Sequence, residues 1–243
     1  MLTDNNTQWL AAANCRSNYM SYTDFLPLLS ALGGLIMLLM LLFQIKKRLK
    51  RKNKSYRSVP MTEDFLIRNC APTLAGIKTA NLFACPYENK AEITEALCRF
   101  NRILSQKGLR ILPLRYSGKK ALIYLYRPKR LSADLRHRQA EEILHPLGYD
   151  CTKCEQCLAQ LSRKLRSQGD FPHEIGLFLG YPPGDVLGFM ENRPCTCKCV
   201  GCWKVYTDEA DAKRKFEQYR KCTHIYCQQW AKGIDIERLT VAG

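Results

Sequence analysis

The feature that most constrains this chain of 243 residues is a run of 21 uncharged residues, positions 25–45. The run reads FLPLLSALGGLIMLLMLLFQI and is apolar on every side of a helix. A helix of about 20 residues is long enough to cross the hydrocarbon core of a bilayer. The run therefore predicts a transmembrane helix rather than a buried core helix. Gly33 and Gly34 would let a second helix approach closely, so self-association through this helix is also expected.

A basic block, residues 46–57, follows the apolar run directly. The positive-inside rule then places the N-terminus outside and the rest of the chain in the cytoplasm. A cleavable signal peptide fits poorly, because the residues before the run are mildly acidic and the run is long. The chain is thus predicted to be a single-pass protein of the cell membrane, with residues 46–57 touching an anionic membrane surface.

Four segments follow from this organisation. They are a short extracytoplasmic N-terminus (1–24), a transmembrane helix (25–45), a basic juxtamembrane linker (46–60) and a cytoplasmic domain (61–243). The formal net charge is +16, and about half of it comes from residues 46–57. The basicity is therefore no sign that the folded domain binds nucleic acid. A hydrophobic content of 46% with 25% charged residues predicts a well-packed body.

Hydrophobic periodicity within residues 61–243 alternates between helical and extended patterns. Helices are predicted near residues 62–70, 88–106, 132–144, 151–166, 182–190 and 207–230. Extended runs are predicted at 79–85, 111–116, 121–127, 203–206 and 236–242, and residues 175–181 are read as a buried strand or a short helix. The runs 111–116 and 121–127 form a hairpin, and Pro113 favours an edge position for the first of them. The fold class expected is α/β: a single globular domain with a four- or five-stranded sheet covered by helices and preceded by one transmembrane helix.

Several stretches of the chain are similar to a bacterial family known as domain-of-unknown-function family 3793. They are CAPTLAGIKTANLF (70–83), LIYLYRP (122–128), FPHEIGLFLGYPPGDVLGFMEN (171–192), WKVY (203–206) and YRKCTHIYC (219–227). The resemblance covers nearly all of residues 60–243 and implies no functional residues. The transmembrane segment is an addition to the family's usual core, and the cysteine content is higher than in similar proteins.

Four cysteines crowd into eight residues at Cys195, Cys197, Cys199 and Cys202. Pro194 precedes them, and the residues between them make no helical stripe. Thiolates at such spacing can converge on one ion, so a site for zinc or an iron–sulfur centre is predicted here. A redox-active thiol pair and a structural loop are the alternatives.

A second cysteine cluster comprises Cys151, Cys154 and Cys157. On a helix these thiols share a face with Leu158 and Leu161, which favours core packing over metal binding. Cys222, His224 and Cys227 lie on a predicted helix near the C-terminus, and they are weaker candidates for additional ligands.

His173 and Glu174 precede an apolar run and a Pro-Gly turn, so they are weak candidates for acid–base work or for a small-ligand site. No phosphate-binding glycine loop, zinc-protease motif or nucleophile elbow is present in the sequence. Basic residues of the predicted hairpin stand beside Tyr116, Tyr124 and Tyr126, a combination that can bind nucleic acid or anionic lipid. Nucleic acid is the less favoured partner.

The leading hypothesis is a membrane-tethered, cysteine-rich cytoplasmic domain that holds zinc or an iron–sulfur centre for metal or redox handling. One alternative is an enzyme with a small-ligand site near His173 and Glu174. The other is an interaction module for anionic lipid or nucleic acid. The sequence does not decide whether the chain is an enzyme.

Overall fold

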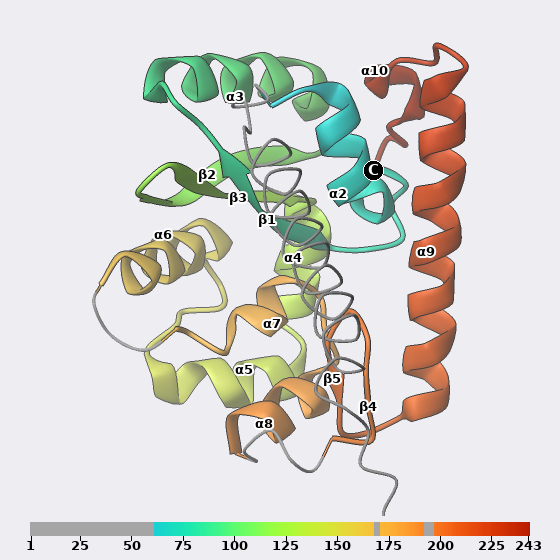
Figure 1. Cartoon of the computed structure of the whole chain (residues 1–243). Coiled ribbons are helices and arrows are strands. Elements are labelled where there is room, and N and C mark those ends of the chain that lie inside the picture. The colour runs from blue at the N-terminus through green and yellow to red at the C-terminus, as the bar shows by residue number, and fades with distance from the viewer. Residues whose placement is uncertain (1–60, 168–170, 192–196) are drawn as a thin grey trace, which may run out of the picture. The chain divides into compact units, whose positions relative to one another are not determined.

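The computed structural model describes residues 61–167, 171–191 and 197–243, which belong to one compact unit, Ser58–Gly243. Its centre is a three-stranded antiparallel sheet in the order β1-β3-β2 (Figure 1). The strands are β1 (Ala80–Pro86), β2 (Arg110–Ser117) and β3 (Lys120–Tyr126). A separate two-stranded hairpin joins β4 (Cys199–Val200) to β5 (Lys204–Val205).

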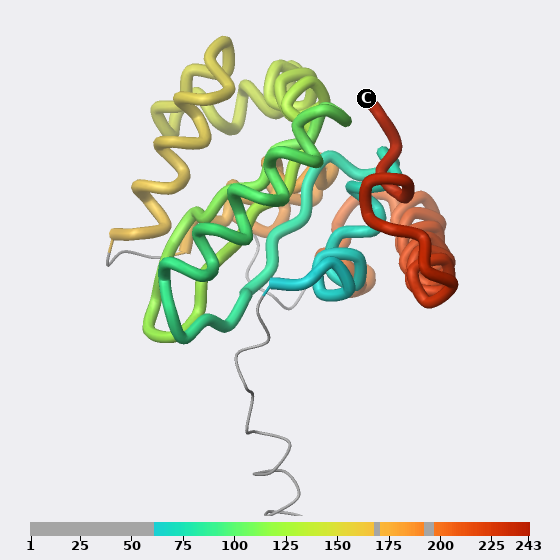
Figure 2. Tube along the Cα trace, turned by 90° about the horizontal axis from the view of Figure 1, so that it is seen from above, coloured from blue at the N-terminus to red at the C-terminus, as the bar shows by residue number. Residues whose placement is uncertain are grey.

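Helices make up most of the described chain. They are α2 (Glu63–Leu74), α3 (Lys90–Ser105), α4 (Pro128–Leu135), α5 (Arg138–Leu144), the 3-10 turn η1 (His145–Leu147), α6 (Cys154–Arg166), α7 (Ile175–Phe178), α8 (Pro183–Glu191), α9 (Glu209–Ala231) and α10 (Ile236–Leu239). Both views place the long helix α9 alongside α2 (Figures 1 and 2).

The predicted hairpin is confirmed as β2 and β3, which pair from Arg110↔Tyr126 to Ser117↔Lys120. Gly118 takes a φ of 53° in the turn, a conformation that glycine adopts without steric cost. The ladder shifts register just after Pro113, because proline has no N–H to donate. The predicted edge position of this strand is also confirmed.

The central strand β3 explains why helices cover both faces of the sheet. Ala121, Ile123 and Leu125 face one core cluster, which is built mainly from α2, α3 and α10. Tyr124 and Tyr126 face another, built from α4, α5, α6, α7 and α8. Successive residues of a strand point to opposite faces, so both sets of side chains are buried. The near-continuous apolar run of β3 follows from this double burial.

Capping residues place several helix ends where the sequence predicts them. Thr62 caps α2 by accepting a hydrogen bond from the amide of Phe65 at 3.2 Å. Asp208 caps α9 in the same way, accepting from the amide of Asp211 at 2.9 Å. The helix predicted at 132–144 is wrong in one respect, because the structure divides the segment into α4 and α5.

The prediction of a four- or five-stranded sheet is wrong. Residues 175–181 contain the short helix α7, and residues 236–242 contain α10 rather than a last strand. The predicted strand at 203–206 exists only as β5, and it pairs with β4 outside the central sheet. Residues 175–181 are a short apolar run, which fits a buried helix turn as well as a buried strand. Residues 236–242 instead begin with a helical turn that Asp235 caps by accepting a hydrogen bond from the amide of Arg238. The fold is a mixed helix and sheet architecture around one small antiparallel sheet.

The prediction of a single-pass membrane protein needs correction as well. Residues 25–45, on which it rests, lie outside the described residues. In the part of the chain that the structure describes, no helix is long and apolar enough to cross a membrane. Helix α9 has the length, with 23 residues, but it carries charges such as Lys213 and Arg220 along its course. The transmembrane assignment and the membrane localisation are therefore not retained.

The other predictions for the first 60 residues also lie outside the described residues. They are the bounds at 1–24 and 46–60, self-association through 25–45, and contact of residues 46–57 with an anionic surface. The structure tests none of them.

Candidate functional site

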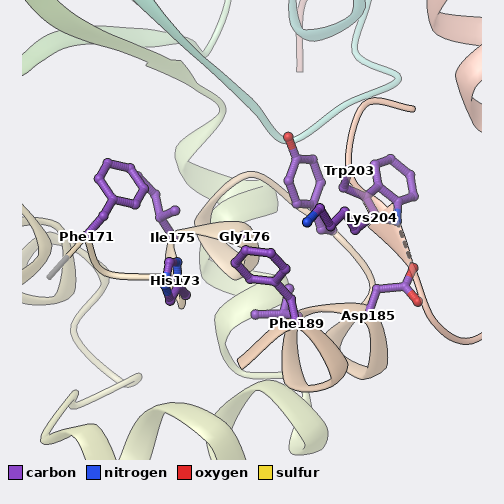
Figure 3. Close-up of a pocket in the computed structure, with 10 residues that line it drawn as sticks. Phe171, His173, Ile175, Gly176, Asp185, Phe189, Trp203 and Lys204 are labelled. Carbon is purple, nitrogen blue, oxygen red and sulfur yellow. Dashed lines mark hydrogen bonds between the residues drawn. The ribbon is translucent and has the colours of Figure 1, made fainter. Parts of the chain in front are cut away.

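A mostly apolar cavity of about 390 Å³ lies between the segment around α7, helix α8 and the β4–β5 hairpin. Figure 3 shows its labelled side chains facing one another across the opening. Phe171 and His173 precede α7, Phe189 belongs to α8, and Trp203 and Lys204 come from the hairpin. The other lining residues are Ile175, Gly176, Tyr181, Asp185 and Val186. We call this cavity the aromatic pocket.

Ring contacts fix the walls of the aromatic pocket. Tyr181 stacks on Trp203 with their centroids 4.9 Å apart. The imidazole of His173 meets Phe189 edge-on, also at 4.9 Å. Phe171 is 44% exposed and lies at the mouth, 6.4 Å from the His173 ring. Edge-to-face and stacked rings at these separations attract one another, so the walls hold their shape without a ligand.

Asp185 holds the pocket together from behind. Its carboxylate accepts hydrogen bonds from the indole nitrogen of Trp203 at 2.7 Å, from the amides of Tyr206 and Thr207 at 2.8 Å each, and from the Thr207 hydroxyl at 2.7 Å. The side chain is only 2% exposed. One residue near the start of α8 thus ties that helix to the hairpin and to the segment leading into α9.

The Asp185 carboxylate is an anchor rather than a free base. Burial would raise its pKa, but the donors from Tyr206, Thr207 and Trp203 outweigh burial and hold the pKa below the ordinary value. Both oxygens already accept hydrogen bonds from these groups. The polar side chains left to meet a ligand are His173 and Lys204, whose ammonium lies 5.3 Å from the centroid of Phe189.

His173 and Glu174 point to different places, although the sequence suggests them as a pair. His173 lines the aromatic pocket. Glu174 is buried and forms an ion pair with Lys164 at 2.9 Å, and it accepts a hydrogen bond from the hydroxyl of Tyr149 at 3.0 Å. Burial would raise the Glu174 pKa, but the hydrogen bonds from Lys164 and Tyr149 bring it below the ordinary value. Glu174 therefore ties α6 to α7 and is not among the residues that line the pocket.

The cluster Cys151, Cys154 and Cys157 packs into the core. Cys151 and Cys157 are buried with Leu158 and Leu161, and Cys154 packs against the same core cluster. Burial raises the pKa of Cys157 to about 12 and raises those of Cys151 and Cys154 as well. Raised pKa values are what burial among apolar side chains produces, in keeping with the packing of these cysteines in the core.

The predicted site at 195–202 is only partly described. Cys195 lies outside the described residues. Cys199 belongs to β4 and packs beside Trp203, while Cys202 lines a different cavity. Among residues 61–167, 171–191 and 197–243, no group of three or more His, Cys, Asp or Glu side chains is arranged to hold a metal ion. A four-cysteine site that includes Cys195 stays a prediction, as do zinc and iron–sulfur as its cofactors.

The weaker candidates for metal ligands and for nucleic-acid contact also lie in the described residues. His224 and Cys227 of α9 line a groove, and Cys222 lies two residues before His224 on the same helix. The basic hairpin does not present a row of exposed rings, because Tyr124 and Tyr126 are buried and stack on each other. This arrangement leaves them no face for a base to stack on.

Sequence reasoning missed most of the aromatic pocket. It identified His173 but not Phe189, Trp203, Lys204 or the anchor Asp185. The density of aromatic residues between positions 171 and 206 is visible in the sequence. What joins them is the fold of α7, α8 and the hairpin, which no local pattern in the sequence reveals.

A family model described as "Protein of unknown function (DUF3793)" matches residues 66–240. No curated protein and no solved structure matches the chain. The matched stretch covers more than half of the chain and contains the central sheet, the aromatic pocket and most of the helices around them. The chain therefore belongs to the DUF3793 family, as its sequence resemblance implies.

Proposed function

We propose that this domain binds a small, planar, largely apolar molecule in the aromatic pocket, with an anionic group of the ligand facing Lys204. The proposal rests on the cavity of about 390 Å³, which is lined mainly by aromatic rings. Lys204 supplies the positive charge in its lining. Small-molecule sites have typical volumes of about 300–1,000 Å³, and their walls are mostly apolar with few polar groups.

The walls suit a flat ligand because they are themselves flat. Trp203, Phe189 and Phe171 offer ring faces and edges to the cavity, and aromatic pairs attract beyond their area of burial. The described residues give Lys204 a contact with the Phe189 ring but no ion pair with a carboxylate. A ligand carboxylate, sulfonate or phosphate would supply that counter-charge.

Binding is favoured over catalysis by the chemistry of the lining. The described lining residues include no serine, threonine or cysteine that could act as a nucleophile. Asp185 has both oxygens occupied by donors of the protein. His173 lines the pocket, but it lacks the partner that the sequence suggested, because Glu174 pairs with Lys164.

The test uses the anionic aromatic dye 1-anilinonaphthalene-8-sulfonate with the full chain. The dye's fluorescence is titrated against wild type and Phe171→Ala. Phe171 is 44% exposed, so its truncation should change stability little while removing one wall of the pocket mouth. We expect the dye to bind wild type and to bind Phe171→Ala about tenfold more weakly, since an aromatic contact of this kind contributes about 0.5–1.5 kcal/mol beyond its buried area.

Leu187→Ala is the matched control. Leu187 is an exposed apolar residue of α8, at 39%, and does not line the pocket. Its truncation should leave dye binding unchanged. Equal losses in the two variants, or no loss in either, would rule out the aromatic pocket as the binding site.

A further inference from the structure

A second cavity, of about 570 Å³, runs between α2 and α9. We call it the α2–α9 groove. Its walls carry the cations of Arg68, Lys78 and Arg220, with His224 beside them on α9. The remaining lining residues are Asn69, Pro72, Asn81, Cys202, Phe216, Tyr219, Thr223 and Cys227. No Asp or Glu is among the described residues that line the groove, so its lining is positively charged.

Lys78 is the unusual member of this set. It follows α2 in the turn that leads into β1, and its amide donates to the carbonyl of Pro72 at 3.1 Å. The whole residue is only 7% exposed. A lysine buried to this degree costs stability unless its charge is paired, because its ammonium loses hydration. Burial also lowers the pKa of Lys78, because the charged ammonium is the form that loses hydration.

The partners of the Lys78 ammonium are rings rather than carboxylates. It lies 5.3 Å from the centroid of Tyr181 and 5.8 Å from that of Tyr219. A cation over an aromatic face is attracted by the ring, which keeps the ammonium charged. Burial raises the pKa of both tyrosines to about 12, so neither supplies a negative charge near neutral pH. Within the residues that the structure describes, no carboxylate ion-pairs with Lys78.

The groove also offers a neutral donor. The Asn81 carbonyl oxygen accepts a hydrogen bond from the Thr73 hydroxyl at 2.6 Å, which fixes the orientation of the amide. Its amide nitrogen is then left to donate to another group. The surface cations are already modestly engaged, since Arg68 pairs with Asp64 at 2.8 Å and Arg220 pairs with Glu217. Exposed pairs of this kind exchange partners at low cost.

We propose that the α2–α9 groove binds a small anion with two or more negative charges, held through Lys78 at its floor and through Arg68 and Arg220 at its rim. The buried ammonium supplies an unscreened charge, and the arginines supply planar donors that match phosphate or carboxylate oxygens. The groove is larger than one ion needs, so the anion is a group on a small molecule rather than a bare ion.

This groove is separate from the aromatic pocket, although Lys78 of the groove contacts Tyr181 of the pocket. Tyr181 lines the aromatic pocket with its ring and carries Lys78 over that same ring. No residue is common to the two linings as the structure describes them. The anion site therefore stands even if the aromatic pocket proves empty.

The test is calorimetric titration of the full chain with pyrophosphate and, in a second arm, with citrate at the same ionic strength. The variant is Lys78→Met, which keeps an unbranched chain on the tyrosine faces and removes the charge. Lys119→Met is the matched control, because Lys119 is an exposed lysine of the β2–β3 turn outside the groove. We expect wild type and Lys119→Met to bind alike, and Lys78→Met to bind about tenfold more weakly or worse.

A second measurement shows whether Lys78 serves binding or stability. Without an added anion, we expect Lys78→Met to unfold at the same or a higher temperature than wild type, because it removes an unpaired buried charge. Preference for pyrophosphate or for citrate would identify the chemistry of the anionic group. Binding of neither anion, equal loss in the two lysine variants, or a lowered unfolding temperature with unchanged binding in Lys78→Met would overturn the proposal.

Discussion

Single residues decide much of how this molecule holds together, and the buried charged groups do so most clearly. Asp185 and Glu174 are both carboxylates that the core would reject without partners. Asp185 is surrounded by N–H and O–H donors, and Glu174 by one ammonium and one phenol. Each joins two separate elements, α6 with α7 for Glu174 and α8 with the β4–β5 hairpin for Asp185. Substitutions of these two buried carboxylates are therefore expected to have large and specific effects.

Asp185→Asn should lower the free energy of unfolding by about 1–3 kcal/mol, the usual cost of leaving buried polar groups without partners. The asparagine amide nitrogen would face the indole N–H of Trp203, and two donors cannot bond. Urea unfolding at pH 7 measures the loss. Glu155→Gln, at an exposed acid of α6, is the control and should have little effect.

The pH dependence of this effect has a defined sign. The pKa of Asp185 is lowered in the folded state, so its contribution is fully present above the unfolded-state value of about 3.9. It is lost as the pH falls through the lowered folded-state pKa. The difference in stability between wild type and Asp185→Asn should therefore be constant near neutral pH and shrink below about pH 4. A difference that grows in acid would contradict this account.

At the scale of elements, local sequence patterns predict several helices and the central hairpin, and they fail where two segments of similar pattern meet. The hairpin, the caps at Thr62 and Asp208, and the helices α3 and α6 follow from local patterns. The break between α4 and α5 can be explained only once the buried residues of the two helices are known from the structure. Leu131 and Leu135 form one buried pair, and Ala140 and Leu144 form another. In one unbroken helix the two pairs would face directions about 180° apart at about 100° per residue. Breaking the helix at Arg136–His137 lets both pairs reach the same core cluster.

The candidate sites were harder to predict than the elements, for a physical reason. His173 was found because histidine is chemically conspicuous, while Trp203 and Phe189 look like ordinary core residues. Lys78 looks like any surface lysine, and only the packing of α9 beside α2 reveals its burial. Clusters of cysteines are ambiguous in a sequence, because a small apolar thiol and a ligand thiol are the same residue.

One side chain completes the edge of the central sheet. Asn101, from α3, donates to the carbonyl of Ile111 at 2.6 Å and accepts from the amide of the same residue at 3.0 Å. Its amide thus acts as a short neighbouring strand on the edge strand β2. Asn101→Ala should lower the unfolding free energy by about 1–3 kcal/mol and increase aggregation, because it leaves two backbone groups unpaired.

Chemical denaturation and light scattering of Asn101→Ala would measure both effects. Thr94→Ala is the comparison on the same helix, since the Thr94 hydroxyl only bonds the carbonyl of Lys90 within α3. If Thr94→Ala were as destabilising as Asn101→Ala, the loss would come from the helix itself and not from the sheet edge.

At the scale of the whole described unit, the two large core clusters are joined by the central sheet, whose three strands each carry side chains into both. Residues of β3 alternate between them, so neither face of the sheet can lose its packing without disturbing the other. Small domains with shared core elements usually unfold in one cooperative step. The unit 58–243 should behave in the same way.

Leu161→Ala tests this cooperativity. Leu161 is fully buried in α6, and its truncation should cost about 2–5 kcal/mol. Trp203 and Trp230 pack in the other clusters, so their fluorescence reports regions that do not contain Leu161. We expect the urea midpoints from fluorescence and from far-ultraviolet circular dichroism to fall together. A fluorescence midpoint that stays at the wild-type value would show that the clusters unfold independently.

The hydrogen bonds of the Asp185 carboxylate also make the opening of the aromatic pocket measurable by hydrogen exchange. The amide protons of Tyr206 and Thr207 are held by a side chain of α8, across the wall of the cavity, rather than by a neighbouring strand. They can exchange with solvent deuterium only when the hairpin segment separates from α8. The exchange rate of these two amides therefore measures how often the pocket wall opens in the ligand-free protein, and a ligand that spans the wall would slow them both.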